Sequence, residues 1–536
     1  MNLYLYGYGP PGRYQWIMLD LGVAFGGEYE PGIDLIFPDI RFIESERKAL
    51  AGILLTHAHE DHFGAVIDLW PRLKAPLYAT PFTAGLLKAK LASNGRDNDI
   101  PVNVIPRKSR LDIGPFDVEL VDMAHSIPEP NAVVLRTPAG TVFHTGDWKL
   151  DPDPVTGPPT DGKRITEIGD EGVLAMVCDS TNAMREGMSA SETQVADALA
   201  TIISESPERV AVTTFASNVA RLISVIRGAH AAGRHVVVVG MAMHRTLNVA
   251  REMGMLDPGI ELLSEDDYGY LPRDKVLCLC TGSQGEPRGA LARIASDSHP
   301  RVTFAAGDRV IFSSRTIPGN EKAVARVQNG LVDMGVEVIT DEDGLVHVSG
   351  HPRRGELEQM YKWVRPRMAV PMHGEARHLA AHAALARGFG VRQVLLARNG
   401  TLIRFAPGEA SVIDEAPAGR LHKDGKLLID ADAESIRARR RLAFAGAVMV
   451  SLAMTSKGEL IGDPRIDFSG VPGEEEGATM LEDVAYDAAA GAFDSIPRSR
   501  RRDPGLVAEA VRRAVRAEIN SVWGKKPHCV VHVHVA

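Results

Sequence analysis

Short apolar runs in the first part of the chain end, one after another, on polar residues that can bind a metal ion or transfer a proton. The run Ala51–Leu55 predicts a short buried strand, and His57 follows it closely. Three further runs show the same pattern: residues 118–121 precede His125, residues 141–144 precede Asp147, and residues 173–178 precede Asp179. An α/β scaffold gathers the ends of its strands along one edge of a sheet, so this pattern predicts one shared site.

From Val210 onward the alternation of strands and helices becomes more regular. The apolar runs 210–214, 236–239, 276–280 and 309–312 predict buried strands, separated by helices at residues 219–231 and near Thr246. This pattern indicates a parallel, doubly wound module set inside the chain. After it, residues 346–351 return to the first domain, and the strand at residues 368–372 leads to His373.

Residues 57–62 carry the densest chemistry of the chain, in the pattern His-x-His-x-Asp-His. Residues i and i+2 of an extended segment point the same way, so His57 and His59 can bind one metal ion. Asp61 and His62 lie one turn further on, where we expect them to face a second ion. Imidazole and carboxylate suit zinc or a similar cation. A histidine-rich surface loop is the alternative, and the spacing directly after an apolar strand argues against it.

Composition and charge narrow the class of protein. The chain has 536 residues, of which 45% are hydrophobic and 24% charged, as in an ordinary α/β protein of two or three domains. It has no uncharged apolar run of membrane-spanning length, so we expect no membrane association. Four scattered cysteines predict no disulfide framework and a cytoplasmic location.

The net charge of −9 argues against a protein that coats nucleic acid non-specifically, but it does not exclude a nuclease with local contacts. Basic clusters occur at residues 353–354, 365–367, 437–441 and 498–502. Each cluster, taken alone, is typical of a solvated face.

The C-terminal part is predicted as a separate domain. Residues 411–432 are polar and contain Gly and Pro, which favours a linker. Residues 433–536 follow, with a strand at 445–452, a helix at 504–523 and an alternating strand at 530–535. The helix has an apolar stripe and the last strand an exposed edge, so we expect this domain to act in self-association. RNA binding through residues 437–441 is the competing interpretation. His532 and His534 share one face of the last strand and are interpreted as edge-strand residues, not ligands.

The motifs together resemble a known family. The histidines and aspartates described above resemble the ordered motifs of the metallo-β-lactamase superfamily. Asp179, His351 and His373 resemble the additional motifs of its nucleic-acid-processing β-CASP branch. The resemblance is closest to the bacterial ribonuclease J family and is carried by these segments: Asp179–Asn182, Phe215–Asn218, Thr281–Pro287, His347–His351 and Pro371–Glu375.

This resemblance implies the fold and the activity. The expected fold is an α/β metallo-β-lactamase αββα sandwich (residues 1–205 and 346–410) with an inserted doubly wound β-CASP domain (206–345). A small α/β C-terminal domain (433–536) follows. The expected activity is hydrolysis of single-stranded RNA, as a 5′-to-3′ exoribonuclease that prefers a 5′-monophosphate and also has endoribonuclease activity. The expected roles are rRNA maturation and mRNA decay, by a homodimer or homotetramer.

The resemblance also implies a ligand set for two Zn²⁺ ions per subunit, with Mn²⁺ or Mg²⁺ as alternatives in the cell. His57, His59 and His125 are expected to bind one ion, and Asp61, His62 and His373 the other. Asp147 is expected to bridge the two ions. Two metal ions would activate a water molecule and hold the attacking and leaving oxygens in line.

Further roles are implied for residues around the metals. Asp179 is expected to orient ligands or handle a proton, and His351 to act as the general acid for the departing 3′-oxygen. One phosphate of the RNA is expected at His347, Val348, Ser349, Gly350 and His351, and a neighbouring one at Ser217 and Asn218. Gly32 and Asp34 resemble a structural calcium site of some members, although a turn aspartate without a metal explains them equally well.

Two departures from the family pattern stand out. The family normally has a glycine-rich strand ahead of a segment like Met1–Tyr4, so we expect either a late-assigned start or a reorganised sheet edge. Residues 352–355, Pro-Arg-Arg-Gly, replace small polar residues and add charge beside the RNA path.

Three alternative functions remain open from the sequence. The first is another hydrolase with this metal site, such as a lactamase or a thioesterase, which the large inserted module disfavours. The second is a DNA-directed β-CASP nuclease. The third is a non-catalytic scaffold for RNA degradation, which is disfavoured because every ligand position carries a competent residue.

Overall fold

The computed structural model describes residues 1–27, 29–473 and 481–536, which divide into two units. Unit 1 consists of residues 1–24 and 37–418, and unit 2 of residues 25–36 and 419–536. All the residues predicted to bind the two zinc ions lie in unit 1, and the predicted calcium residues Gly32 and Asp34 lie in unit 2. The finer division into domains at residues 205, 345 and 410 stays a prediction.

Unit 1 contains two sheets that make up the predicted sandwich. The first has the order β1-β2-β5-β6-β7, with bounds Tyr4–Tyr8, Gln15–Leu19, Leu50–Leu54, Leu77–Ala79 and Val102–Val104. The second has the order β19-β18-β12-β11-β10-β9-β8, with bounds Gln393–Val394, Met368–Met372, Ala175–Asp179, Gly140–His144, Asn131–Thr137, Phe116–Asp122 and Arg110–Ile113. Strands β10 and β11 form a hairpin, in which they pair antiparallel with Thr137 opposite Gly140.

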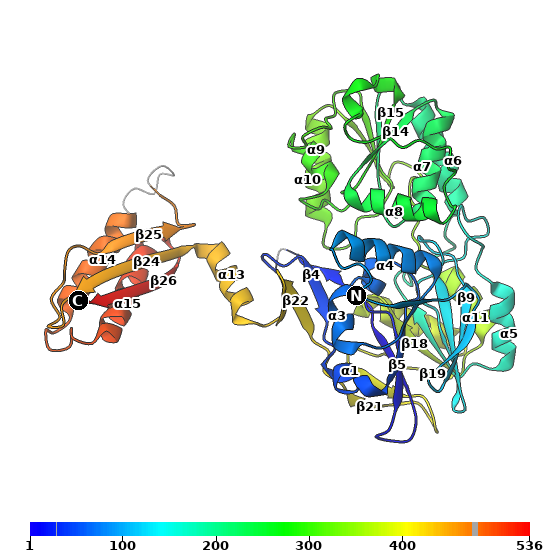
Figure 1. Ribbon diagram of the computed structural model, residues 1–536, viewed down its shortest axis with the longest axis horizontal. Coiled ribbons are helices and arrows are strands. Elements are labelled where there is room, and N and C mark those ends of the chain that lie inside the picture. Colours follow the sequence, from blue (N-terminus) through cyan, green and yellow to red (C-terminus); the bar gives the residue numbers. More distant parts are fainter. Residues whose placement is uncertain (28, 474–480) are drawn as a thin grey trace. The chain divides into compact units, whose positions relative to one another are not determined.

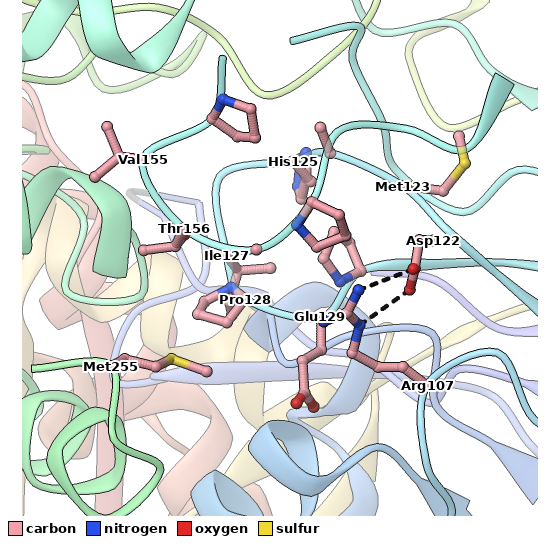
Figure 2. Close-up of a pocket in the computed structure, with 15 residues that line it drawn as sticks. Arg107, Asp122, Met123, His125, Ile127, Pro128, Glu129, Val155, Thr156 and Met255 are labelled. Atoms are coloured by element: carbon pink, nitrogen blue, oxygen red, sulfur yellow. Dashed lines mark hydrogen bonds and ion pairs between the residues drawn. The ribbon is translucent and has the colours of Figure 1, made fainter. Parts of the chain in front are cut away.

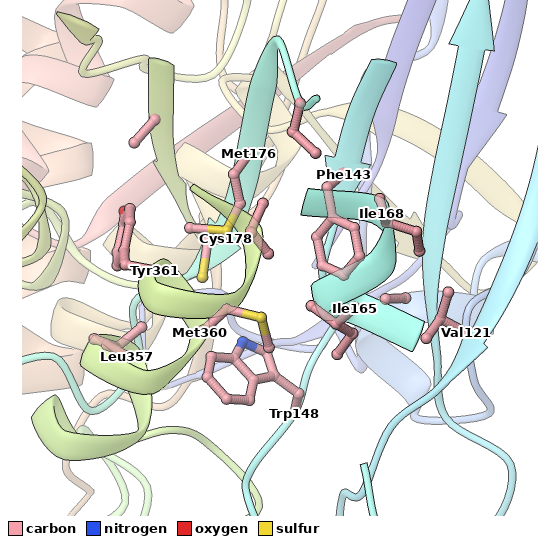
Figure 3. Close-up of a cluster of buried hydrophobic side chains, with 14 of the residues drawn as sticks. Val121, Phe143, Trp148, Ile165, Ile168, Met176, Cys178, Leu357, Met360 and Tyr361 are labelled. Carbon is pink, nitrogen blue, oxygen red and sulfur yellow. The ribbon is translucent and has the colours of Figure 1, made fainter. Parts of the chain in front are cut away.

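The second sheet is buried on both faces, which explains why its strands are apolar runs. Val133 and Leu135 of β10 pack with Ile17 and Leu54 of the first sheet in one core cluster. Their neighbours along β10 point the other way, into a second cluster around Trp148 (Figure 3). Helices α5 (Gly162–Glu171) and α11 (Arg354–Val364) cover that face through Ile165, Ile168, Leu357, Met360 and Tyr361. Helix α12 (Ala376–Gly388) contacts β18.

The inserted module is the predicted parallel, doubly wound sheet. Its order is β14-β15-β13-β16-β17, with bounds His235–Val239, Val276–Cys280, Val210–Thr213, Arg309–Phe312 and Glu337–Ile339, and all four pairings are parallel. Its helices are α6 (Glu192–Glu205), α7 (Val219–Ala231), α8 (Met241–Glu252), α9 (Ala290–Ala295) and α10 (Glu321–Asp333). Figure 1 shows α6 and α7 on one side of this sheet and α9 and α10 on the other.

The module also contacts the sandwich through helices. Helix α4 (Pro81–Ser93) packs on α8, and a Cβ at Gly85 would lie 3.0 Å from Cγ1 of Val249. Burial along α4 is not confined to one stripe, because Phe82, Thr83, Ala84, Leu86, Leu87 and Leu91 are all buried. The shorter helices are α1 (Arg41–Ser45) and α3 (Val66–Leu73).

Unit 2 has its own core. The sheet β25-β24-β26 (Arg465–Ser469, Ala447–Met454, His528–Val535) carries helices α14 (Leu481–Ser495) and α15 (Pro504–Trp523), which bury Phe493 and Val511 among others. Helix α13 (Glu434–Ala445) precedes this sheet. The predicted helix at 504–523 is confirmed, and the last strand lies at a sheet edge as expected. Within the described ranges, no helix combines the length and apolarity needed to cross a bilayer.

Residues 411–432, the predicted linker, contain strands, and their role as a linker between domains stays a prediction. That segment contains β21 (Ser411–Glu415), β22 (Arg420–Asp424) and β23 (Leu427–Asp430). Strand β21 pairs with β20 (Thr401–Arg404), and β22 and β23 form a hairpin with Gly425 at φ +61° in the turn. Strands β22 and β23 belong to the sheet β23-β22-β4-β3, which also contains β4 (Leu35–Pro38) and β3 (Ala24–Phe25). The polar composition reflects exposed strands, because most of these residues remain at the surface.

Candidate metal centre and active site

Four strand ends of unit 1 bring their polar residues together, as the sequence predicts. His57 and His59 follow β5, His125 follows β9, Asp147 follows β11 and His373 follows β18. Three groups have ligand atoms within 4.8 Å of one another: His57, His59, His125 and Asp147; Asp61, His62, Asp147 and His373; Asp179, His351 and His373. Every predicted metal ligand is therefore in a cluster, and Asp147 belongs to two of them.

The first group is built from three imidazoles. Nδ1 of His59 lies 3.1 Å from Nε2 of His57 and 3.0 Å from Nε2 of His125. Oδ2 of Asp147 lies 4.0 Å from His57 and 3.8 Å from His125. Two nitrogen ligands of a tetrahedral zinc ion would be about 3.3 Å apart. The three nitrogens therefore converge as ligands of one ion would.

The second group mixes carboxylates and imidazoles. Nε2 of His62 lies 3.1 Å from Oδ2 of Asp147 and 3.6 Å from Oδ2 of Asp61. Nε2 of His373 lies 3.2 Å from the same oxygen of Asp61 and 3.5 Å from that of Asp147. A short helix, α2 (Glu60–Phe63), presents Asp61 and His62. Oδ2 of Asp147 faces both groups, where a bridging ligand would be.

Residues outside the predicted set fix which ring nitrogen faces the cluster. His62 donates from Nδ1 to Oδ2 of Asp20 at 2.7 Å, and His125 donates from Nδ1 to the carbonyl of Gly350 at 2.6 Å. Nδ1 of His373 lies 2.8 Å from Oγ1 of Thr181. In each ring Nε2 is left to bind, as such outer hydrogen bonds do for metal ligands. The sequence analysis missed Asp20, although it ends the strand β2 in the same pattern as the other site residues.

Electrostatics makes both groups suited to cations. Burial, with help from neighbouring imidazoles, lowers the pKa of His57 and His125, and burial lowers the pKa of His59 to about 4. These rings are therefore uncharged at neutral pH. Burial opposes ionisation of Asp147, but the charges of His373 and His62 outweigh it and hold its pKa well below the usual value.

The residues present fit divalent metal ions. Oδ1 of Asp147 is buried and has no hydrogen-bond partner within the described residues. Around His62, the carboxylates of Asp147, Asp61 and Asp20 outweigh burial and raise its pKa well above the usual value. A buried site with an unpartnered carboxylate oxygen and a field this negative favours the binding of a cation.

His351 and Asp179 form a hydrogen-bonded pair beside the second group. Nδ1 of His351 lies 2.7 Å from Oδ2 of Asp179, and the His351 side chain is 20% exposed. Burial lowers the pKa of His351, but the charge and hydrogen bond of Asp179 dominate and raise it to about 9. The ring can thus hold a proton at neutral pH, with Nε2 free of Asp179.

Comparison with known proteins decides the family. Ribonuclease J of Sinorhizobium meliloti is 54% identical over 533 residues, which cover 99% of this chain and 94% of that relative. The chain belongs to the ribonuclease J family. Ribonuclease J of Corynebacterium glutamicum is 37% identical, covering 95% of the chain and 71% of the relative. Ribonuclease J of Helicobacter pylori strain 26695 is 30% identical, covering 97% and 76%.

Family models match successive parts of the chain. They are the metallo-beta-lactamase superfamily (residues 15–177), the ribonuclease J beta-CASP domain (207–331), the Zn-dependent metallo-hydrolase RNA specificity domain (336–396) and the ribonuclease J C-terminal domain (434–536). The predicted fold class is confirmed. As a ribonuclease J family member, the chain is a nuclease of the hydrolase class, and the lactamase and thioesterase alternatives fall away.

Of the residues predicted to bind phosphate, some lie beside the metal groups and others do not. Ser349 and Gly350 adjoin the metal groups, since the Gly350 carbonyl bonds to His125. Val348 is buried, and Nδ1 of His347 is buried without a hydrogen-bond partner within the described residues. Asn218 caps α7, where its Oδ1 accepts from the backbone N–H of Arg221 at 3.0 Å. Within the described part of the chain, no hydrogen bond or ion pair joins Ser217 or Asn218 to the metal groups, so their role stays a prediction.

A cavity of about 240 Å³ adjoins His125 (Figure 2). Its walls include Ile127, several prolines, and Met255 from the inserted module. Its one arginine, Arg107, is held by two hydrogen bonds to Asp122, at 3.0 and 2.8 Å. The walls therefore offer apolar contact and no uncommitted cation.

The predicted calcium site near Gly32 and Asp34 gains no support from side-chain ligands. Within the described residues, no group of three or more candidate ligands includes Asp34. A Cβ at Gly32 would lie 3.4 Å from a guanidinium nitrogen of Arg439, which is itself ion-paired with Asp424. The calcium site stays a prediction.

Proposed function

We propose that this chain is a two-metal ribonuclease that removes nucleotides from the 5′ end of single-stranded RNA, prefers a 5′-monophosphate and also cuts internally. The observation that supports this proposal most strongly is the pair of ligand groups that share Asp147. Zn²⁺ is the ion that the three-imidazole group favours, with Mn²⁺ or Mg²⁺ as alternatives for the oxygen-rich group. His57, His59 and His125 would hold the first ion, and Asp61, His62 and His373 the second.

The chain's own residues would divide the chemistry as follows. When bound, the two metal ions would supply Lewis acidity and a nucleophilic water. Asp147 would bridge the two ligand groups and fix their spacing. Asp179 would hold His351 through the 2.7 Å hydrogen bond, and His351 would give its proton to the departing 3′-oxygen. The segment from His347 to Gly350, with Ser217 and Asn218, would bind phosphates of the RNA.

RNA is favoured over DNA because the matched RNA specificity domain spans residues 336–396, which include both the segment at His347–His351 and the ligand His373. The cavity beside His125 fits a sugar or base better than a phosphate, because its one arginine, Arg107, is committed to Asp122 and Glu129 adds a second carboxylate. A non-catalytic scaffold would not need a residue able to bind metal at each of the seven predicted ligand positions. We further propose roles in rRNA maturation and mRNA decay, in the cytoplasm, as a dimer or tetramer.

The decisive experiment is a time course on one RNA labelled at either end. A 5′-label should appear first as a mononucleotide, while a 3′-label should move gradually to shorter products, and the same DNA sequence should persist because it lacks the 2′-OH. An RNA with a 5′-hydroxyl should be degraded more slowly from its end. Equal turnover of DNA, or loss of nucleotides from the 3′ end, would overturn the proposal.

A further inference from the structure

A single side chain, Asn182, ties the phosphate-binding segment to an arginine from the inserted module. Nδ2 of Asn182 donates to Oγ of Ser349 at 2.9 Å and to the carbonyl of His351 at 3.1 Å. On its other side, Nη1 of Arg315 donates to Oδ1 of Asn182 at 3.4 Å. Arg315 follows β16, so the contact brings the end of an inserted strand next to Ser349.

Two more arginines surround the same turn. The N–H of Arg185 donates to the carbonyl of Asn182 at 2.8 Å, which closes the turn. The carbonyl of Arg185 accepts from the N–H of Arg354 at 2.9 Å, so the segment that carries Arg353 runs alongside. Arg185, Arg315 and Arg353, which we call the arginine cluster, thus come from three segments far apart in the sequence.

The arginine cluster lacks neutralising partners. Arg354 is ion-paired with Glu186, whereas the three members of the cluster form no ion pair within the described residues. The Nε of Arg353 is buried without a hydrogen-bond partner there.

The three arginines also act on one another. Burial lowers the pKa of Arg185, and the charges of Arg315 and Arg353 lower it further, against a weaker opposing effect of Asp341. Like charges held together in a partly buried place cost folding free energy, which an anion would recover.

We propose that the arginine cluster is an anion subsite that binds a further phosphate group of the RNA, next to the phosphate bound at Ser349. The inference rests on the proposed function. Guanidinium groups match phosphate oxygens in pairs of hydrogen bonds, and three of them can surround one phosphate. The subsite would position the RNA chain and contribute no group to bond breaking.

The test compares three single variants, Arg185→Gln, Arg315→Gln and Arg353→Gln, with the control Arg110→Gln. Arg110 is ion-paired with Asp117 at the edge strand β8, so the control removes the same charge elsewhere. Glutamine keeps a hydrogen-bond donor at each position. The readout is kcat/KM on 5′-phosphorylated and 5′-hydroxyl RNA over a range of salt concentrations, together with bound metal and the thermal midpoint.

Each cluster variant should lower kcat/KM about tenfold or more, the loss expected for a charge-assisted contact. The plot of log kcat/KM against log salt concentration should also become shallower by about 0.7, which is the slope contributed by one neutralised phosphate of a single strand. Metal content should match the wild type, and the thermal midpoint should hold or rise because repulsion is relieved. If kcat/KM falls only on 5′-phosphorylated RNA, the arginine cluster binds the terminal phosphate. If it falls on both RNAs, the cluster binds an internal phosphodiester.

Cluster variants that match the control in kcat/KM and in salt slope would overturn the proposal. So would a lost thermal midpoint with an unchanged salt slope, which would assign the arginines a purely structural role. Failure of the proposed function is distinct from either result, because the wild-type protein itself would then leave RNA intact.

Discussion

Replacing Arg221 should show how strongly the inserted module is held to the phosphate-binding segment. The Arg221 guanidinium is fully buried and bonds to Oε2 of Glu192 at 3.0 Å. It also donates to the carbonyls of Ser313, at 3.2 Å, and Val346, at 3.1 Å. Val346 directly precedes His347, so one side chain joins α6, α7, the end of β16 and the returning segment.

The expected cost follows from what Arg221→Met leaves behind. Breaking a buried ion pair from one side costs about 3–5 kcal/mol, because the remaining charge is buried and uncompensated. Lys149 lies 3.6 Å from Oε1 of Glu192 and offsets part of this, so we expect the lower end, about 3 kcal/mol. The two carbonyls that lose their donor account for part of the same loss.

Urea unfolding followed by far-UV circular dichroism measures this cost, with the first transition assigned to unit 1. The double variant Arg221→Met/Glu192→Leu should recover at least 1 kcal/mol relative to the single variant, because it removes the orphaned carboxylate. The surface control Arg110→Gln should change stability by less than about 1 kcal/mol. An Arg221→Met cost no larger than that of the control, or a double variant that is merely additive, would refute this reasoning.

Three further outcomes are expected. His351→Ala should keep bound metal and lower the single-turnover rate by roughly 10²–10⁴-fold, and a drop in metal content would instead make His351 a ligand. Deleting residues 433–536 should reduce the number of chains per particle in light scattering and leave turnover per site intact, whereas an unchanged number of chains with weakened, salt-sensitive RNA binding would favour RNA contact. Burial lowers the pKa of His382 to about 4. Below about pH 6.5 the unfolded state alone takes up that proton, so stability falls toward pH 4. His382→Gln should flatten this fall by up to about 1.4 kcal/mol per pH unit in urea titrations, and an unchanged slope would contradict the assignment.

The predictions from the sequence were most accurate for buried strands that are followed directly by metal ligands. Strands such as β15 and β16 have the predicted bounds, because fully buried parallel strands are apolar runs with clear ends. The metal ligands were found because they follow such runs. Asp20 shows the same pattern and was missed, since a lone aspartate after a strand carries no spacing signal. Its role emerges only when the fold brings it to His62.

Exposed strands, and charged clusters formed by residues far apart in the chain, could not be predicted from the sequence. Strand β22 is mostly polar and strand β23 is exposed or half-buried along its length, so the composition that suggested a linker was that of a surface hairpin. The arginine cluster joins residues 185, 315 and 353, and no local pattern connects such distant positions. The basic pair at 353–354 appeared as one cluster, yet the structure separates a paired Arg354 from an unpaired Arg353.

The central claim is that two metal ions bound by the groups sharing Asp147 carry out the hydrolysis. The most direct test refills metal-free protein with Zn²⁺ in steps and measures both bound metal and turnover of a 5′-phosphorylated RNA. The expected result is two bound equivalents, with turnover appearing as the second one binds. His59→Ala, which removes a ligand at a strand end and not in the core, should stay folded, hold one equivalent at most and leave the RNA intact. Full turnover with one equivalent or fewer, in the wild type or in His59→Ala, would contradict the two-metal account.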